Sequence, residues 1–184
     1  MFALIFGLSF LTNAQDIQNN QPKGYQFTDI KRLPATSVKD QARAGTCWSW
    51  SGISFFESEM IRMGKEPIDL SAMYIVRHAY SDKATKFVRL HGNMNFAVGG
   101  AFCDVMHVIK NYGIVPLEVM PGIMYGDTLP VHNELDAVAS GYINAIAKGK
   151  LSKLTPVWKN GLAAIYDTYL GKCPENFTYK GKEY

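Results

Sequence analysis

A block of apolar residues at helical spacing begins directly after Cys47 and constrains the chain more than any other feature. Residues three or four apart share one face of a helix, so the block predicts an amphipathic helix, and Gly64 is a natural stop for it. A cysteine therefore lies at the start of a helix with one broad buried face. The residues on that face are Trp48, Gly52, Phe55, Phe56, Met60 and Met63.

Four further segments look helical, and the sequence between them contains Gly and Pro turns. The helical segments are 71–78, where Ser71 can cap the helix, 101–111, 134–148 and about 157–170. Residues 81–100 lack a steady period and are predicted to form a long loop. The tail, 176–184, alternates like a strand. The pattern predicts an α+β chain that consists mainly of one helical lobe.

The predicted helix at 101–111 has its own apolar face and a stop. We expect its buried side to consist of Phe102, Val105, Met106 and Ile109, and Gly113 to end it.

Composition excludes several classes of protein. Apolar residues make up 47% of the 184 residues and charged residues 19%, which is a globular balance. The net charge of +3 comes from scattered lysines, so nucleic-acid binding is not expected. Cys47, Cys103 and Cys173 do not have zinc-site spacing, so neither a metal nor another cofactor is expected. Cys103 and Cys173 are predicted as buried free thiols, with a disulfide between them as the alternative.

The first residues resemble a secretory signal. Residues 1–11 are apolar and small residues follow, so 1–14 is predicted as a signal peptide, with a buried N-terminal helix as the alternative. Residues 15–27 are predicted as a polar leader and 28–184 as the folded lobe. No other stretch is long enough to cross a membrane. We therefore expect a secreted or periplasmic protein with no membrane contact after signal cleavage.

The segment around Cys47 carries nucleophile chemistry. The unpaired N–H groups at a helix start favour a thiolate, which is the nucleophilic form of cysteine. Attack on an amide carbonyl produces an oxyanion that needs hydrogen-bond donors. The Cys47 backbone N–H is one candidate donor and the side-chain amide of Gln41 is the other. Gly45 allows close backbone approach.

The run Ala44-Gly45-Thr46-Cys47-Trp48 resembles the papain-family signature C-G-[SA]-C-[WY]. Ala44 replaces the first Cys of the signature, which removes a disulfide partner, and Thr46 replaces Ser or Ala. Further similarity covers about residues 28–125 and points to the bleomycin hydrolase and aminopeptidase C branch. It lies in Leu33–Gln41, in Asp69-Leu-Ser-Ala-Met-Tyr74 and in Gly99–Pro116. The later part, with 124–127 and 132–135, resembles bacterial members of that branch through less specific motifs.

This resemblance implies a papain-like cysteine peptidase, a thiol protease of aminopeptidase-like type, that hydrolyses peptides through a thioester on Cys47. It implies Gln41 as oxyanion donor. It also implies that Gly99 and Gly100 bind an extended peptide on the acyl side, with Trp48 in the substrate site. Without the resemblance, the glycine pair would be interpreted as a turn.

The resemblance also implies a histidine and an asparagine that lie about 130 to 150 residues past the cysteine, and the last histidine here is His132. His78, His91, His107 and His132 are expected to be packing, surface or turn residues. In the family, a sheet-rich second lobe carries the histidine, so we expect that lobe to be largely absent and the strand-like tail to lead toward it. The partner expected is this C-terminal catalytic lobe, and the chain alone should have little turnover.

Two other functions stay open at this stage. The chain could be a truncated noncatalytic homologue that binds peptides or proteins, or it could perform acyl transfer other than proteolysis, such as amide transfer. The sequence leaves substrate preference and homo-oligomer formation undecided.

Overall fold

The computed structural model describes Tyr25, residues 27–149 and residues 153–184. The predicted signal peptide and nearly all of the predicted leader lie outside these residues, and so both remain predictions. Within the described residues, no helix combines the length and apolar character needed to cross a bilayer.

Contacts divide the chain into two units at the peptide bond between Arg32 and Leu33. The described part of the first unit is exposed, and the Arg32 guanidinium lies 2.9 Å from the Asp29 carboxylate. The second unit, residues 33–184, contains every helix and strand of the described chain.

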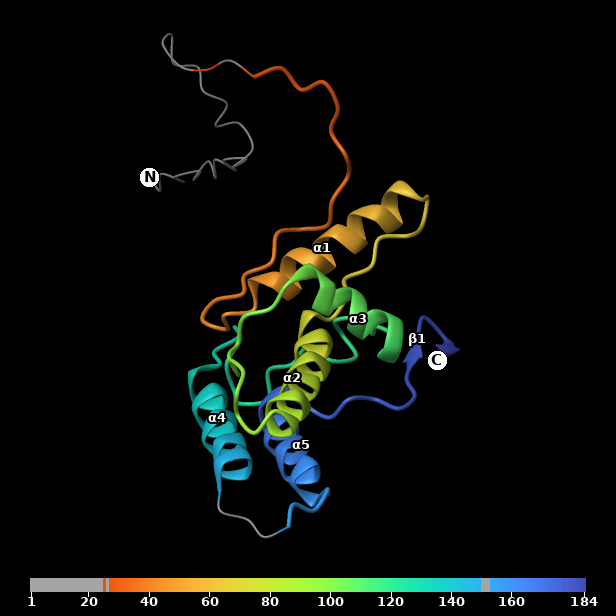
Figure 1. Cartoon of the computed structure of the whole chain (residues 1–184). Helices are drawn as coiled ribbons and strands as arrows, with labels where there is room; N and C mark the ends of the chain where they lie inside the picture. Colours follow the sequence, from red (N-terminus) through yellow and green to blue (C-terminus); the bar gives the residue numbers. More distant parts are fainter. Residues whose placement is uncertain (1–24, 26, 150–152) are drawn as a thin grey trace, which may run out of the picture. The chain divides into compact units, whose positions relative to one another are not determined.

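The second unit is mostly helical, as the sequence predicts (Figure 1). Among the described residues the only sheet is the antiparallel pair β1–β2. The tail predicted as one strand is thus a hairpin, because Lys180 and Gly181 both have positive φ, as a tight two-residue hairpin turn requires. The elements are α1 (Cys47–Arg62), α2 (Ala72–Arg89), α3 (Phe102–Tyr112), α4 (Asn133–Lys148), α5 (Val157–Leu170), β1 (Thr178–Tyr179) and β2 (Lys182–Glu183).

Helix α2 is central and contacts all four other helices. Its N-terminus is capped as predicted, because the Ser71 hydroxyl accepts a hydrogen bond from the Tyr74 N–H at 3.0 Å. The loop predicted from residue 81 is wrong over 81–89, which continue the helix. The reason is packing: Ala84, Phe87 and Val88 are buried and continue the inward face begun at Tyr80.

Helix α3 buries only part of the predicted face: Val105 and Ile109 pack inward as predicted, whereas Phe102 and Met106 do not. Val105 and Val108 are fully buried, whereas Phe102 and Met106 are 45% and 47% exposed. The inward face is set by α1, where a Cβ on Gly52 would lie 2.8 Å from Val105 Cγ2. Because Gly52 has no side chain, the two helices approach closely at this point.

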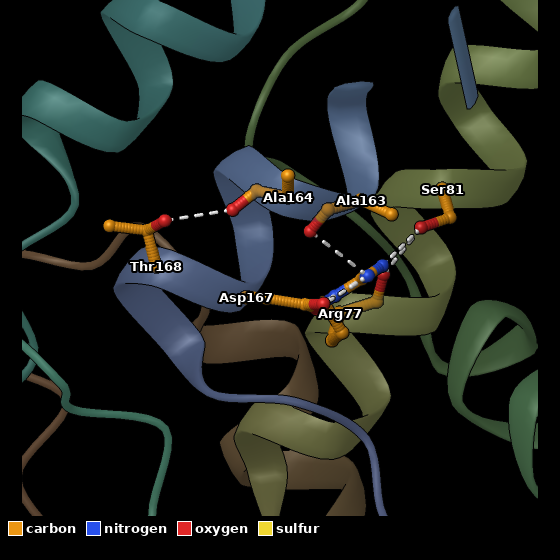
Figure 2. Close-up of polar contacts among 6 residues, drawn as sticks. All are labelled: Arg77, Ser81, Ala163, Ala164, Asp167 and Thr168. Atoms are coloured by element: carbon orange, nitrogen blue, oxygen red, sulfur yellow. Dashed lines mark hydrogen bonds and ion pairs between the residues drawn. The ribbon is translucent and has the colours of Figure 1, made fainter. Parts of the chain in front are cut away.

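Helix α5 is fixed to α2 by Arg77 (Figure 2). One guanidinium nitrogen of Arg77 lies 2.9 Å from the Asp167 carboxylate, and another donates to the Ser81 hydroxyl at 2.6 Å. Arg77 also donates to the Ala163 carbonyl at 3.4 Å. The buried guanidinium is thus paired with one carboxylate and hydrogen-bonded to a hydroxyl and a carbonyl. A buried cation needs partners of this kind.

Replacing Ser71 tests the start of the central helix. Its hydroxyl also donates to the Met120 carbonyl at 2.6 Å, so Ser71→Ala removes a helix cap and leaves a buried acceptor unpaired. We expect a loss of about 2 kcal/mol in the free energy of unfolding, measured by urea titration. The matched control is Ser54→Ala, on the exposed face of α1, which should change stability by less than about 0.5 kcal/mol. Equal effects of the two changes would contradict the assigned role.

Candidate active site

Cys47 is the first residue of α1, and its side chain is exposed. Thr46, directly before it, is fully buried and its hydroxyl accepts a hydrogen bond from the Trp50 indole at 3.1 Å. That hydroxyl therefore does not cap α1. In the described chain, the first turn of α1 has neither a side-chain cap nor an acidic residue. The exposed thiol thus lies at a helix start with uncapped N–H groups, which favours negative charge at that point.

The loop before Cys47 turns sharply. Ala42 and Gly45 have positive φ, and the Ala42 N–H is held by the Asp40 carboxylate at 2.7 Å. A Cβ on Gly45 would lie 2.8 Å from Val98 Cγ2, so glycine is required there both for space and for conformation. Gln41 is half-buried at the other end of this loop. Its side-chain amide has no hydrogen-bond partner within the described residues, whereas its carbonyl accepts from the Ala44 N–H at 3.2 Å.

The loop is supported by a segment that sequence reasoning did not connect to it. The Arg43 N–H donates to the Pro130 carbonyl at 3.0 Å, and the His132 N–H donates to the Arg43 carbonyl at 3.3 Å. Residues 130–132 therefore form a short parallel bridge with the loop before the nucleophile. A single sequence contains no signal for a backbone pairing this far apart along the chain.

Glu57 fixes the extended segment that leads to Gln41. It is 1% exposed, accepts a hydrogen bond from the Leu70 N–H at 2.8 Å and lies 2.9 Å from the Lys39 ammonium. The Thr36 hydroxyl also donates to it. Sequence reasoning missed Glu57, because this residue lies off the predicted apolar face of the helix at 48–63.

Trp48, the residue after Cys47, packs against the segment that contains the predicted peptide-binding glycines. Its indole N–H donates to the Val98 carbonyl at 3.0 Å, and a Cβ on Gly100 would lie 2.5 Å from the indole ring. Trp48 is itself only 6% exposed. Its side chain lies in the core, where it positions the glycine segment, and the substrate contact predicted for it stays a prediction.

Two side chains of α2 bind the same segment. The Tyr80 hydroxyl donates to the Val98 carbonyl at 3.3 Å, and the Lys83 ammonium donates to the Gly99 carbonyl. These carbonyls are thus engaged by the protein itself. Of the residues proposed for the site, Gly100 packs against Trp48, the residue that follows Cys47.

The four histidines lie in different places. His107 and His91 are exposed, and His78 stacks on Tyr112 at 4.2 Å between ring centroids. His132 is fully buried against the Ala44 backbone, and neither ring nitrogen makes a well-formed hydrogen bond in the described chain. Burial lowers the pKa of His132 to about 4, so its imidazole is neutral at pH 7. No hydrogen bond joins a histidine to Cys47 within the described residues.

The other two cysteines differ from each other. Both are free thiols, so the alternative of a disulfide between them is excluded in this structure. Cys103 is exposed, which makes the prediction of a buried thiol wrong there. Cys173 is partly buried as predicted, and burial raises the pKa of its thiol.

Comparison with known proteins gives a likeness at the level of the fold. No protein-family model matches the chain, and no curated protein matches it. A solved structure does match, that of PepW from Lactobacillus rhamnosis HN001, with 18% identity and a TM-score of 0.56 over 83% of this chain. The chain has the fold of part of PepW. It spans 41% of PepW's length.

The paired glycines allow a direct test of the contact with Trp48. Gly100→Ala places a methyl group against the indole ring, and we expect a loss of about 1–3 kcal/mol in unfolding free energy and an altered tryptophan fluorescence spectrum. Gly99→Ala is the matched control, because its Cβ would meet nothing within 4 Å. Urea unfolding followed by fluorescence measures both effects. Equal stability of the two variants would contradict the packing described.

Thiol labelling tests the exposure of the three cysteines. With iodoacetamide at pH 7.5 in the native protein, we expect Cys47 and Cys103 to react first. Cys173 should react about tenfold or more slowly, because it is partly buried and its thiol pKa is raised. Mass spectrometry of tryptic peptides gives the three rates, and unfolding in urea should equalise them. Labelling of Cys173 ahead of Cys47 would contradict the assignment.

Proposed function

We propose that this chain is the nucleophile-bearing part of a cysteine peptidase and that Cys47 forms a thioester with its substrate. The observation that carries the proposal is the exposed Cys47 thiol at the uncapped start of α1, beside the sharply turned loop from Gln41. The likeness to part of PepW supports the fold on which this proposal rests. The resemblance of residues 44–48 to the papain signature supports the cysteine type.

In the proposed reaction, the Cys47 thiolate attacks the carbonyl carbon of a peptide bond. The carbonyl oxygen becomes an oxyanion, which accepts hydrogen bonds from the Cys47 backbone N–H and the Gln41 side-chain amide. When the C–N bond breaks, the leaving amine takes up a proton, and the acyl group remains on sulfur. Water then attacks the thioester, which releases the carboxylic acid and regenerates the thiol.

The proton donor and its orienting asparagine are proposed to come from a second lobe. PepW extends well beyond the part that this chain matches, so a larger architecture has room for such a lobe. An extended peptide is proposed to lie along Gly99 and Gly100, which are both exposed. Because Lys83 engages the Gly99 carbonyl, the exposed N–H groups of this segment are the groups proposed to bind the peptide.

The location of the protein belongs to the proposal as well. We propose that residues 1–14 direct export and that 15–27 link this signal to the lobe at 28–184, which places the enzyme outside the cell or in a periplasm. Peptides are the substrates proposed, with neither metal nor organic cofactor.

An activated ester tests the nucleophile without a proton donor, because nitrophenolate leaves unprotonated. We expect a burst of about one equivalent of 4-nitrophenolate from the acetyl ester and a matching mass increase on Cys47. Cys47→Ala should abolish the burst and Cys103→Ser should preserve it. Gln41→Ala should slow it about 100-fold, because one oxyanion donor is lost. A burst that survives Cys47→Ala would refute the assignment.

The alternative is a noncatalytic peptide-binding module. The observation in its favour is that no histidine contacts Cys47 in the described part of the chain. A fluorescent extended peptide distinguishes the two functions. Saturable binding that is lost when a side chain is placed at Gly100, together with no ester burst, would favour the module.

A further inference from the structure

A small cavity lies between α2, α4, α5 and the segment 96–98, and the proposed chemistry of Cys47 does not use it. Its volume is about 30 Å³, about twice what one water molecule needs by the same measure. Its polar lining consists of Tyr80, Asp136, Ser140 and Tyr166. Phe96 and Ala139 belong to its apolar wall.

Two of these polar groups have no partner. Tyr166 is fully buried, and its hydroxyl makes no hydrogen bond in the described structure. The Asp136 carboxyl is partly buried, and within the described residues it has neither a hydrogen bond nor an ion pair. Burial without a donor raises the pKa of Asp136 to about 6. A carboxylate in such a place needs a cation or a hydrogen-bond donor.

The cations nearby are already paired with other groups. The Arg77 guanidinium lies 5.0 Å from the centre of the Tyr166 ring, but it is held by Asp167, as Figure 2 shows. Lys83 lies 5.8 Å from the centre of the Tyr80 ring, but its ammonium donates to the Gly99 carbonyl. Segment 96–98 contributes no charge. Asp136 is therefore the uncompensated charge of this cavity.

We propose that this cavity binds the ammonium group of a small primary amine. The Asp136 carboxylate would accept a hydrogen bond from the ammonium and balance its charge, and the Tyr166 oxygen would accept a second. The apolar wall suits the attached carbon, and the Tyr80 and Tyr166 rings, 6.0 Å apart, add aromatic surface that favours a cation. A water molecule would satisfy the Tyr166 hydroxyl but not the charge of Asp136. The site is independent of the Cys47 reaction.

Methylammonium is the probe for this site, titrated into the full chain at pH 8 and followed by calorimetry and by NMR shifts. Asp136→Asn should weaken binding about tenfold or more, because the charged acceptor is lost. The matched control is Glu134→Gln, two residues earlier on α4, where the exposed glutamate accepts from the Tyr169 hydroxyl. This control should bind as the wild type does. Tetramethylammonium, which cannot donate and exceeds the cavity, should not bind.

The pH dependence gives a second readout. Lowering the pH from 8 to 5 protonates Asp136 and should weaken methylammonium binding, whereas Tyr80 and Tyr166 stay protonated because burial raises the pKa of each. Tyr166→Phe keeps the carboxylate and should weaken binding a few fold, which provides a test should Asp136→Asn fail to fold. Far-ultraviolet circular dichroism checks the fold of each variant. Absence of binding in the wild type, or equal binding in Asp136→Asn, would overturn the proposal and leave a buried water as the occupant.

Discussion

The burial of α2 is the constraint on which the rest of the unit depends. This helix contacts the four others, and every residue from Ala72 to Arg77 is buried, so neighbours must surround its first half. Its start is fixed by the Ser71 cap, and its middle is joined to α5 through Arg77 (Figure 2). From this centre, Tyr80 and Lys83 reach the carbonyls of the glycine segment. The packing of the core thus sets the geometry of the candidate site.

Trp48 also determines how the candidate site is arranged. It directly follows Cys47, the candidate nucleophile, and its side chain lies in the core. Its indole holds the Val98 carbonyl and packs over Gly100, while Val98 itself packs against the position of Gly45. The loop before Cys47 and the glycine segment are therefore positioned by one pair of side chains. Because core side chains hold this segment, a peptide bound there, as proposed, would meet a preorganised surface, which lowers the entropic cost of binding.

Sequence reasoning predicted what short-range patterns encode. The helix that starts at Cys47, the Ser71 cap and the segment 157–170 agree with the structure. The extension of α2 to Arg89 was missed because residues 81–89 show no steady apolar period, and tertiary packing decides their conformation. The face of α3 was misjudged in part because Gly52 on another helix decides it. The bridge between Arg43 and Val131 depends on folding alone, so no local pattern encodes it.

The bridge between Arg43 and residues 130–132 limits how far the chain can be shortened without losing contacts of the cysteine loop. The connection between α3 and α4 forms part of the frame around the cysteine loop, even though it is far away along the chain. A shortened version that ended after α3 would retain every residue of the signature yet lose the backbone partners of Arg43. The smallest unit that keeps these hydrogen bonds around the cysteine loop therefore extends at least to His132.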